Sequence, residues 1–264
     1  MVTRILKRAY IIFIYFFLYA PIIVLAFYSF NNSRTRGAWT GFTFKWYLAM
    51  FQDRQIMTSL YYSLLIGAIA AIIATFIGTL AAFGIDKMKP LPRATVMNLT
   101  YLPVLNPDIV TGISFMLLFI FIRLRLGFLT LLLSHITFNI PYVILSVLPR
   151  VKQLDKNMYE AALDLGATPT LAFRKVILPE IMPGVITGLL LAFTLSLDDF
   201  VISFFNTGSG VSTLSITIYS MARRGVNPKI NALSTLMFFS VLTLLVTVNI
   251  MMSRQKHSKT KEEF

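Results

Sequence analysis

The chain has 264 residues and a formal net charge of +13, and 56% of its residues are hydrophobic while only 13% are charged. Ordinary globular domains carry about 25% charged residues, so this composition argues against a soluble domain and indicates a protein that lies in lipid. The chain has no cysteine and only two histidines, which excludes disulfides and thiol chemistry, and we expect no metal site. Lys and Arg gather in short clusters between apolar runs, which is typical of membrane-flanking loops and not of a nucleic-acid-binding surface.

Several apolar segments are long enough to cross a hydrocarbon core, which takes about 20 residues in a helix. They are apolar on nearly all sides, so the sequence predicts an all-α membrane protein with transmembrane helices rather than amphipathic surface helices. We expect six spans, at residues 9–30, 60–85, 94–122, 128–148, 181–205 and 233–252.

The distribution of basic residues predicts the orientation of these spans. With the N-terminus inside, the inner stretches carry more Lys and Arg than the outer ones, which predicts cytoplasmic N- and C-termini. The chain is then one transmembrane domain over residues 1–264, with a cytoplasmic loop at 150–180 and a polar cytoplasmic tail at 253–264 that we expect to be frayed.

Two predicted outer loops, at residues 31–59 and 206–232, are long enough to meet a partner outside the membrane. Within the second loop, the amphipathic run 215–224 is followed by Gly225. This pattern predicts a helix that lies near the outer interface and ends at the glycine.

The cytoplasmic loop predicts two short helices joined at a glycine. Asp155 is placed to act as an N-cap, and Gly166 is placed to end the first helix. The dipeptide Thr168-Pro169 offers a cap and a first helical position for the second helix, and Leu178-Pro179 is expected to end it before the fifth span. The loop should therefore form a compact knob, on which small residues allow another protein to approach closely.

The same loop resembles the EAA loop of ABC-importer permeases. It reads Glu160-Ala161-Ala162, three further residues, Gly166, nine further residues, and Val176-Ile177-Leu178-Pro179. The family pattern is E-A-A, x3, G, x9, I-x-L-P, and only its isoleucine is replaced, by Val176. The resemblance implies a coupling helix that docks into a groove on an ATPase subunit, through Glu160, Ala161, Ala162, Gly166, Leu178 and Pro179. The alternative is that Glu160 lies on a solvated helix face and that Gly166 is an ordinary helix end.

The chain contains no G-x-x-x-x-G-K-[ST] sequence, so it is not expected to hydrolyse ATP or to bind a cofactor itself. An ATPase that uses ATP and Mg must then be supplied by a partner. Six helices are also few for a closed pathway, so we expect a second permease subunit, either identical or related.

Three acidic residues lie inside predicted spans, where a charged side chain is costly and commonly functional. Asp108 lies in the third span, and Asp198 and Asp199 lie in the fifth, while the core of each span lacks Lys and Arg. This pattern indicates a cationic substrate that supplies the missing charge. The alternative is that each Asp is protonated or is satisfied by Ser, Thr or Asn on a neighbouring helix.

Asp198 and Asp199 are adjacent and cannot point in the same direction from one helix. Each belongs to a different polar stripe, and either stripe is suited to line a pathway. The stripes are Ser196, Asp199 and Ser203 on one side and Thr187, Thr194 and Asp198 on the other.

Two prolines predict an irregular third span. Pro103 and Pro107 should kink or unwind the helix beside Asn106 and Asp108, which frees backbone carbonyls for hydrogen bonds from ammonium groups. In the first outer loop, Trp46 is suited either to stack on a cation or to anchor the chain at the membrane interface.

The sequence around the acidic residues is similar to that of spermidine/putrescine importer permeases, specifically the second of their two permease subunits. The likeness lies in 196–201, SLDDFV, and 106–110, NPDIV, and spans essentially the whole chain. It implies the type I ABC-importer permease fold and a complex of two different permeases, two ATPases and an extracytoplasmic polyamine-binding protein. The candidate substrate-pathway residues are Asp108, Asp198, Asp199, Ser196, Asn106 and Trp46.

Three alternatives remain open from the residues. The same machinery could carry another cation, or an anion such as sulfate, because the predicted outer loops are basic. An ion-coupled carrier would use the Asp residues as proton sites without an ATPase. A structural membrane scaffold would show no transport phenotype when Asp108 or Asp198 is neutralised.

Overall fold

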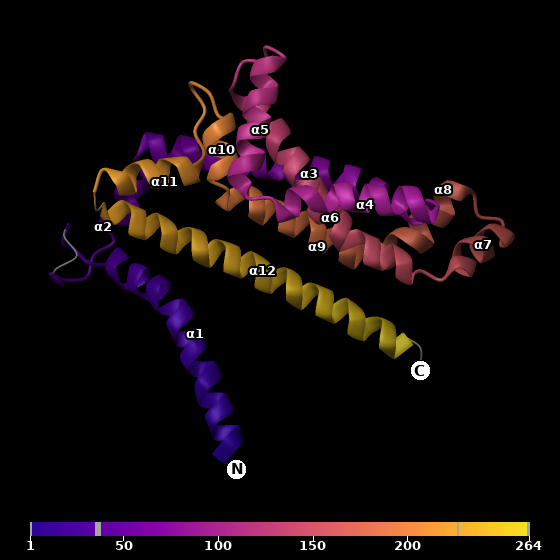
Figure 1. Ribbon diagram of the computed structural model, residues 1–264. Helices are drawn as coiled ribbons and strands as arrows, with labels where there is room; N and C mark the ends of the chain where they lie inside the picture. The colour runs from indigo at the N-terminus through magenta and orange to yellow at the C-terminus, as the bar shows by residue number, and fades with distance from the viewer. Residues whose placement is uncertain (1, 35–37, 226, 263–264) are drawn as a thin grey trace. The chain divides into compact units, whose positions relative to one another are not determined.

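The computed structural model describes residues 2–34, 38–225 and 227–262, and over these it consists of helices and short connections (Figure 1). Five helices in the described part are long and apolar enough to cross a membrane, and the number becomes six if a bent pair counts as one span. The chain forms two compact units, one made of residues up to Thr58 and from Thr217 onward, the other of Ser59–Ile216.

The first unit contains α1 (Val2–Ser29), α2 (Lys45–Phe51) and α12 (Pro228–Glu262), and α12 packs against both α1 and α2. Large apolar side chains such as Phe13 and Phe17 of α1 are 65% and 72% exposed, which suits a helix that faces lipid or another subunit.

Two features of this unit differ from the sequence prediction. α2 was expected to be loop, although its sequence KWYLAMF contains good helix formers. The tail was expected to be frayed, but α12 continues through residue 262 and leaves 263–264 outside the described residues. Lys, Gln, Arg and Glu, which are frequent in this tail, favour helix once a preceding helix provides the nucleus.

The second unit is built around α3 (Arg54–Lys87), α6 (Phe128–Gln153) and α9 (Leu178–Asp198). Its core includes Ala74 of α3, Val143 of α6 and Ile181 of α9. The helices approach closely where a glycine faces a neighbour, since a Cβ added at Gly78 would lie 2.7 Å from the Val143 side chain. Small residues at such contacts are the usual means of packing helices in a membrane.

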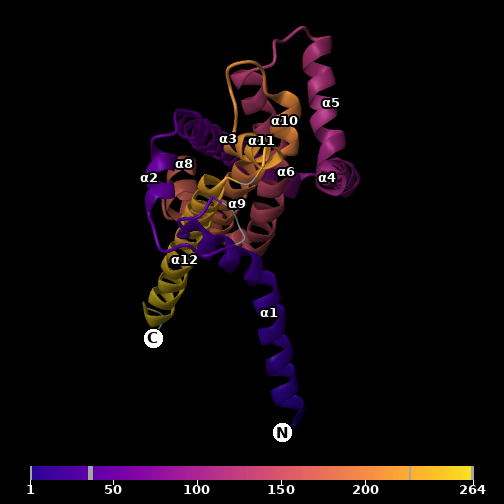
Figure 2. The ribbon, with the colours of Figure 1, turned by 90° about the vertical axis from the view of Figure 1, so that its left-hand side faces the viewer.

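The third predicted span is broken into α4 (Pro90–Leu105) and α5 (Asp108–Phe121), which meet at 105°. Figure 2 shows α4 nearly end-on, while α5 is seen from the side and runs upward in the picture. The break lies at Pro107, because a proline disfavours helical geometry at the residue before it and Asn106 accordingly has the extended values φ −73° and ψ 144°. Pro103 lies inside α4 without ending it, so the predicted kink is confirmed at one proline only.

The fifth predicted span is also interrupted. α9 ends at Asp198, and the short helix α10 (Val201–Asn206) follows after two residues. α10 packs against α5 and α6, so the two broken spans meet in this unit.

The predicted helix end at Leu178-Pro179 is wrong. α8 (Pro169–Ala172) continues through a π-helical turn, η1 (Phe173–Ile177), directly into α9. In this turn the Leu178 N–H donates to the carbonyl of Phe173, five residues earlier. Because proline donates no hydrogen bond and its ring crowds the preceding turn, the widened turn accommodates Pro179 without ending the helix.

Candidate substrate pathway and coupling loop

Asp108 and Asp198 lie at the two helix breaks. Asp108 is the first residue of α5 and Asp198 is the last residue of α9, and both side chains are exposed in the isolated chain. The segments that carry them meet, since a Cβ added at Gly112 in α5 would lie 3.4 Å from the Cα of Ile202 in α10. The charges of the two carboxylates are within range of each other. In the described part of the chain neither has an ion-pair partner. The structure therefore brings together two acidic residues that are 90 positions apart in the sequence, and it leaves both accessible.

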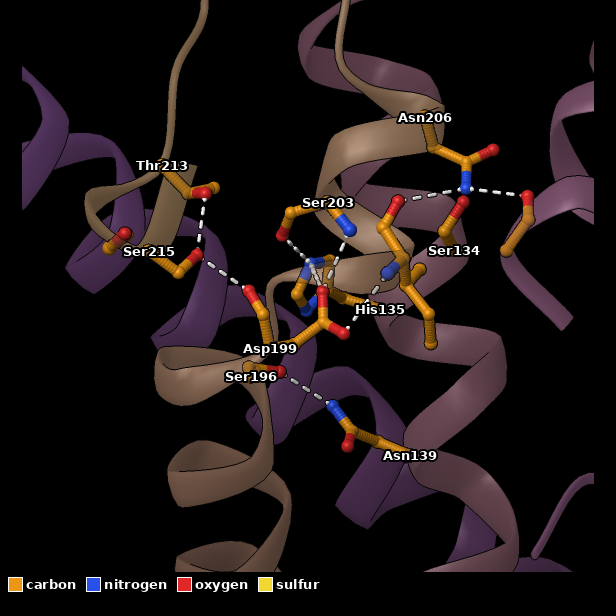
Figure 3. Close-up of polar contacts among 12 residues, drawn as sticks. Ser134, His135, Asn139, Ser196, Asp199, Ser203, Asn206, Thr213 and Ser215 are labelled. Atoms are coloured by element: carbon orange, nitrogen blue, oxygen red, sulfur yellow. Dashed lines mark hydrogen bonds and ion pairs between the residues drawn. The ribbon is translucent and has the colours of Figure 1, made fainter. Parts of the chain in front are cut away.

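Asp199 has different surroundings, because its side chain is only 7% exposed. One carboxylate oxygen accepts the N–H of Ile202 at 3.1 Å and the other accepts the N–H of Ser203 at 2.7 Å (Figure 3). These N–H groups belong to the first turn of α10, where a helix leaves donors unsatisfied. Asp199 thus caps α10, and its negative charge lies at the positive end of that helix.

His135 of α6 joins this capped turn to the neighbouring helix. Its Nε2 lies 3.0 Å from the Ser203 hydroxyl and 3.7 Å from the Asp199 carboxylate, and the ring is 1% exposed. The backbone carbonyl of Asp199 accepts a hydrogen bond of 2.6 Å from the Ser215 hydroxyl. These contacts hold the break between α9 and α10 to α6 and to the start of α11 (Leu214–Arg223) (Figure 3).

Asn206 ties the far end of α10 to α5. Its side-chain amide donates to the carbonyl of Gly112 at 3.1 Å, and the Thr130 hydroxyl of α6 donates to the Asn206 carbonyl at 2.9 Å. A Cβ at Gly112 would meet Phe205 at 3.3 Å, so the glycine allows α5 to lie against α10. α10 is therefore fixed to α5 and to α6 by buried polar and close apolar contacts.

The two polar stripes of the fifth span point to different surroundings. Ser196 is 4% exposed and accepts a hydrogen bond of 2.7 Å from Asn139, so the stripe of Ser196, Asp199 and Ser203 faces α6. Thr187 and Asp198 are exposed and Thr194 is half-buried. The exposed stripe is the one available to a solute or to another subunit.

Asn106 and Trp46 are not part of one polar group. Asn106 is exposed at the α4–α5 break, next to Asp108. Trp46 belongs to the other unit, is 7% exposed, and donates its indole N–H to the carbonyl of Asn31 at 2.7 Å. The Lys45 ammonium lies 4.7 Å from the centre of a Trp46 ring, so a cation already occupies one face of this side chain.

Over the described residues, no group of three or more His, Asp or Glu is placed to hold a metal ion.

The loop predicted to be cytoplasmic contains α7 (Lys156–Asp164), whose ends agree with the sequence prediction. Asp155 accepts the N–H of Asn157 at 2.9 Å and is the N-cap. After α7, Gly166 has φ +86°, donates its N–H to Leu163, and is followed by Ala167, which donates to Ala162. This pair of hydrogen bonds is a Schellman motif, and it reverses the chain with a residue in the left-handed region that glycine tolerates best.

The surface of α7 carries an exposed apolar residue among polar ones. Leu165 is 89% exposed, and Glu160, Ala161 and Gly166 are exposed beside it, while Ala162 is half-buried. Farther along, Leu178 packs against the core of the unit and Pro179 is exposed. Thr168 accepts the N–H of Leu171 at 3.4 Å and caps α8 as expected. An almost fully exposed leucine side chain at a helix end is suited to a surface that another protein covers.

Comparison with known proteins identifies the family. Residues 74–259 match the family described as binding-protein-dependent transport system inner membrane component. The chain belongs to this family. It is a multi-pass inner-membrane transporter permease, and not an enzyme in itself.

Several curated relatives of this permease have names that describe polyamine transport. The spermidine/putrescine transport system permease protein PotC of Escherichia coli (strain K12) is 41% identical over 248 residues, which cover 94% of this chain and 93% of PotC. PotC of Haemophilus influenzae is 37% identical over 96% of this chain and 98% of its own length. The putrescine transport system permease protein PotI of Escherichia coli (strain K12) is 41% identical over 85% of this chain and 83% of PotI.

Solved structures support the permease fold. A bacterial ABC transporter involved in the import of the acidic polysaccharide alginate matches with a TM-score of 0.70 at 19% identity, covering 96% of this chain and 98% of that one. The same kind of transporter, in complex with an alginate pentasaccharide-bound periplasmic protein, matches with a TM-score of 0.71 at 18% identity, over 96% and 94% of the chains. At this identity the likeness establishes the fold and says nothing of the cargo.

One neighbour of the acidic pair was missed from the sequence. Tyr142 of α6 is half-buried, lies within range of the charge on Asp108, and packs its ring 5.2 Å from that of Phe138. No signal in the sequence singles out this tyrosine among eleven, because its nearness to Asp108 follows only from the bend between α4 and α5. The permease thus presents an aromatic side chain within range of the exposed Asp108 carboxylate.

Proposed function

We propose that this chain is a permease subunit of an ATP-driven ABC importer that moves polyamines, spermidine or putrescine, across the cytoplasmic membrane. The observation that carries the proposal is the exposed acidic pair of Asp108 and Asp198, together with 41% identity to a spermidine/putrescine permease over 94% of this chain. In a membrane protein, two neighbouring carboxylates without resident cations are costly, and a ligand with several ammonium groups offsets that cost.

The pathway in this proposal runs past the exposed stripe of α9. Asp108 and Asp198 accept charge-assisted hydrogen bonds from the ammonium groups, and Asn106 adds polar donors and acceptors at the α4–α5 break. Tyr142 offers a ring face to the cation or to the methylene chain between two ammonium groups. Ser196 and Asp199 contribute by holding the α9–α10 break, since their polar atoms are already engaged within the chain.

The α7 loop receives the ATP-driven motion in this proposal. An ATPase dimer contacts Glu160, Ala161, Ala162, Gly166 and the bare Leu165 side chain, and the continuous helix from α8 into α9 carries the displacement toward Asp198. The support is the EAA pattern, the Schellman turn that presents it, and the unbroken helix of 30 residues from Pro169 to Asp198. The partner ATPase binds ATP and Mg.

The remaining parts of the complex follow from the family. We propose a second, related permease subunit and an extracytoplasmic polyamine-binding protein that delivers the cargo to the outer loops. Both termini of this chain lie in the cytoplasm, which is supported by the excess of Lys and Arg in the loops on that side.

The proposal is tested by reconstituting the chain with its partner permease and ATPase and measuring uptake of labelled spermidine and putrescine with added binding protein. Uptake that requires ATP, and that falls when Asp198 is changed to Asn with the complex intact, supports it. ATP-dependent uptake of a different solute, unaffected by Asp198→Asn, would instead favour another cargo on the same machinery. Uptake driven by a proton gradient without ATPase would favour an ion-coupled carrier.

A further inference from the structure

A cavity of about 680 Å³ lies in the first unit, among the connections that join its helices. Its lining comes from three places in the sequence: Arg34 after α1, Trp46 and Asp53 in and after α2, and Arg224 after α11 with Lys229 in the first turn of α12. These connections belong to the two loops predicted to lie outside the membrane. The cavity is therefore at a water-facing end of the unit, away from the apolar part of its helices.

The charges in this cavity are unbalanced. Lys229 forms an ion pair with Asp53 at 2.8 Å, and Asp53 also accepts the N–H groups of Gln55 and Ile56 at 3.2 and 3.3 Å. Among the described residues that line the cavity, Asp53 is the only acidic one, and it and Lys229 neutralise each other. Arg34 and Arg224 then leave an excess of two positive charges on the cavity.

Hydrogen bonds within the chain hold the two walls of the cavity that carry Arg34 and Arg224. Trp46 is 7% exposed and donates to the carbonyl of Asn31, and the Asn31 side chain in turn accepts the N–H of Ser33 at 3.2 Å, next to Arg34. On the other wall, the guanidinium of Arg224 donates to the Ser220 hydroxyl at 2.8 Å, which leaves most of its five N–H donors for a ligand. Both arginines are exposed.

The sign of the charge excludes the proposed cargo as the ligand, because a polyamine is itself a cation and is repelled by two arginines. An anionic group is needed, and a planar carboxylate matches the guanidinium fork. The rest of the lining includes Trp46 and Met221, and arginine, tryptophan and methionine are the residues enriched at protein interfaces. This combination favours an acidic protein surface over an isolated phosphate.

We infer that this cavity is a docking site for acidic side chains of the extracytoplasmic binding protein, with Arg34 and Arg224 as the residues that receive them. The inference rests on the proposed function for the presence of that partner, and it adds the surface and its chemistry. A site of this kind orients the binding protein and speeds its arrival, while the cation it carries is kept out of the cavity and free to reach Asp108 and Asp198.

The test uses the intact complex in lipid nanodiscs and measures binding of the purified binding protein at low and high salt. We expect the double variant Arg34→Glu with Arg224→Glu to slow association by about ten-fold or more and to show a weaker dependence on salt. Arg224→Lys keeps the charge and should lose much less. Arg34→Gln with Arg224→Gln provides a neutral variant if the double reversal prevents assembly. Basal ATP hydrolysis without binding protein should be unchanged in all of them.

The single variant Arg224→Glu is measured as well, and Arg125→Glu is its matched control, because Arg125 is an exposed arginine in another connection predicted to be outside. An equal loss in this control would mean general charge attraction and would overturn the inference, as would unchanged docking in both double variants. The double variants could instead dock normally but lose a dependence of docking on anionic lipid that the wild-type complex shows. That result would assign the cavity to a lipid phosphate. Polyamine uptake by the wild-type complex is measured in the same preparation, so that absence of uptake counts against the proposed cargo and not against this site.

Discussion

Asp198 and Asp199 are consecutive in the chain, yet their carboxylates lie in opposite surroundings. Asp198 is exposed at the end of α9, whereas the Asp199 side chain is 7% exposed and accepts two backbone N–H groups of α10. α9 ends at Asp198, and α10 begins at Val201. In this break the Asp199 side chain turns inward, whereas Asp198 remains exposed. Because the two carboxylates have different surroundings, variants of Asp198 and of Asp199 should have different consequences.

Neutralising Asp198 should weaken the interaction with a cationic substrate and leave the protein folded. Hydrogen bonds to charged groups contribute about 1.5–3 kcal/mol, so Asp198→Asn should raise the KM for spermidine uptake by about ten-fold to a hundred-fold. Asp108→Asn should act in the same direction. The measurement is uptake into proteoliposomes as a function of spermidine concentration.

The control for this prediction is Asp86→Asn, since Asp86 lies near the end of α3 and pairs with Arg93 at 3.7 Å, outside the acidic pair. It should leave KM within about two-fold, because exposed ion pairs contribute little. A normal KM in both Asp198→Asn and Asp108→Asn would remove these residues from the pathway.

Removing Asp199 should act on the fold of the α9–α10 break. Asp199→Ala leaves two N–H groups of α10 without their acceptor and removes the charge near His135, so we expect a loss of about 1–2 kcal/mol in stability. Asp199→Asn should be intermediate, because one of the two acceptor oxygens becomes an N–H donor. Thermal unfolding of the purified complex measures this loss. A variant with unchanged stability and a raised KM would instead make Asp199 a direct substrate ligand.

The sequence predicted the positions of the spans because each is a long apolar run. The structure places helices over all of them, although the third is bent into α4 and α5 and the fifth is interrupted after Asp198. It also predicted the ends of α7, where Asp155 and Gly166 are local signals that need no tertiary information. The break at Pro107 was predicted for a similar reason, as proline acts on the residue directly before it.

Other features depend on contacts that are distant in sequence. The break after Asp198 has no proline or glycine, and it is stabilised by His135 and Ser215 from other segments. The continuation of the helix past Pro179 depends on a π-helical turn, which cannot be recognised from the residue types. The separation of Asp198 from Asp199 follows from that break, so the sequence could name both carboxylates but not assign their directions.

Gly166 should be required for the shape of the loop that contains α7. Its φ of +86° lies in the left-handed region, where a side chain costs about 1–2 kcal/mol, while the space around it is open. Gly166→Val should therefore misplace α7 through the backbone alone and reduce the stimulation of ATP hydrolysis by the binding protein. Gly84→Val is a suitable control, because Gly84 also has open space but lies within α3 at ordinary helical geometry. Full stimulation in Gly166→Val would show that the turn is not needed for coupling.

The ion pair of Lys229 with Asp53 predicts a dependence of stability on pH. The hydrogen bond from Lys229 lowers the pKa of Asp53 below its ordinary value of 3.8. The contribution of the pair is therefore fully present above pH 3.8 and is lost as pH falls through the lower pKa of the folded state. Lys229→Met should lower stability by about 0.2–1 kcal/mol at neutral pH, given the partial exposure of both side chains, and by less in acid.

This prediction is checked by thermal unfolding of the wild-type and Lys229→Met proteins over a series of pH values. The difference in unfolding temperature between the two proteins should shrink as the pH drops below the range in which Asp53 is ionised. A difference between the proteins that stays constant down to the lowest pH would show that Lys229 stabilises the fold without its charge pairing to Asp53.

Uptake of polyamines by the reconstituted complex tests directly whether this chain forms part of an ATP-driven path for them. Labelled spermidine and putrescine are offered to proteoliposomes that contain the chain, its partner permease and its ATPase, with binding protein outside and ATP inside. We expect uptake that requires ATP and binding protein and that is strongly reduced by Asp198→Asn, with the complex still assembled. Polyamine uptake that continues without ATP, or none at all from an assembled complex whose ATPase is stimulated by a binding protein for another solute, would contradict it.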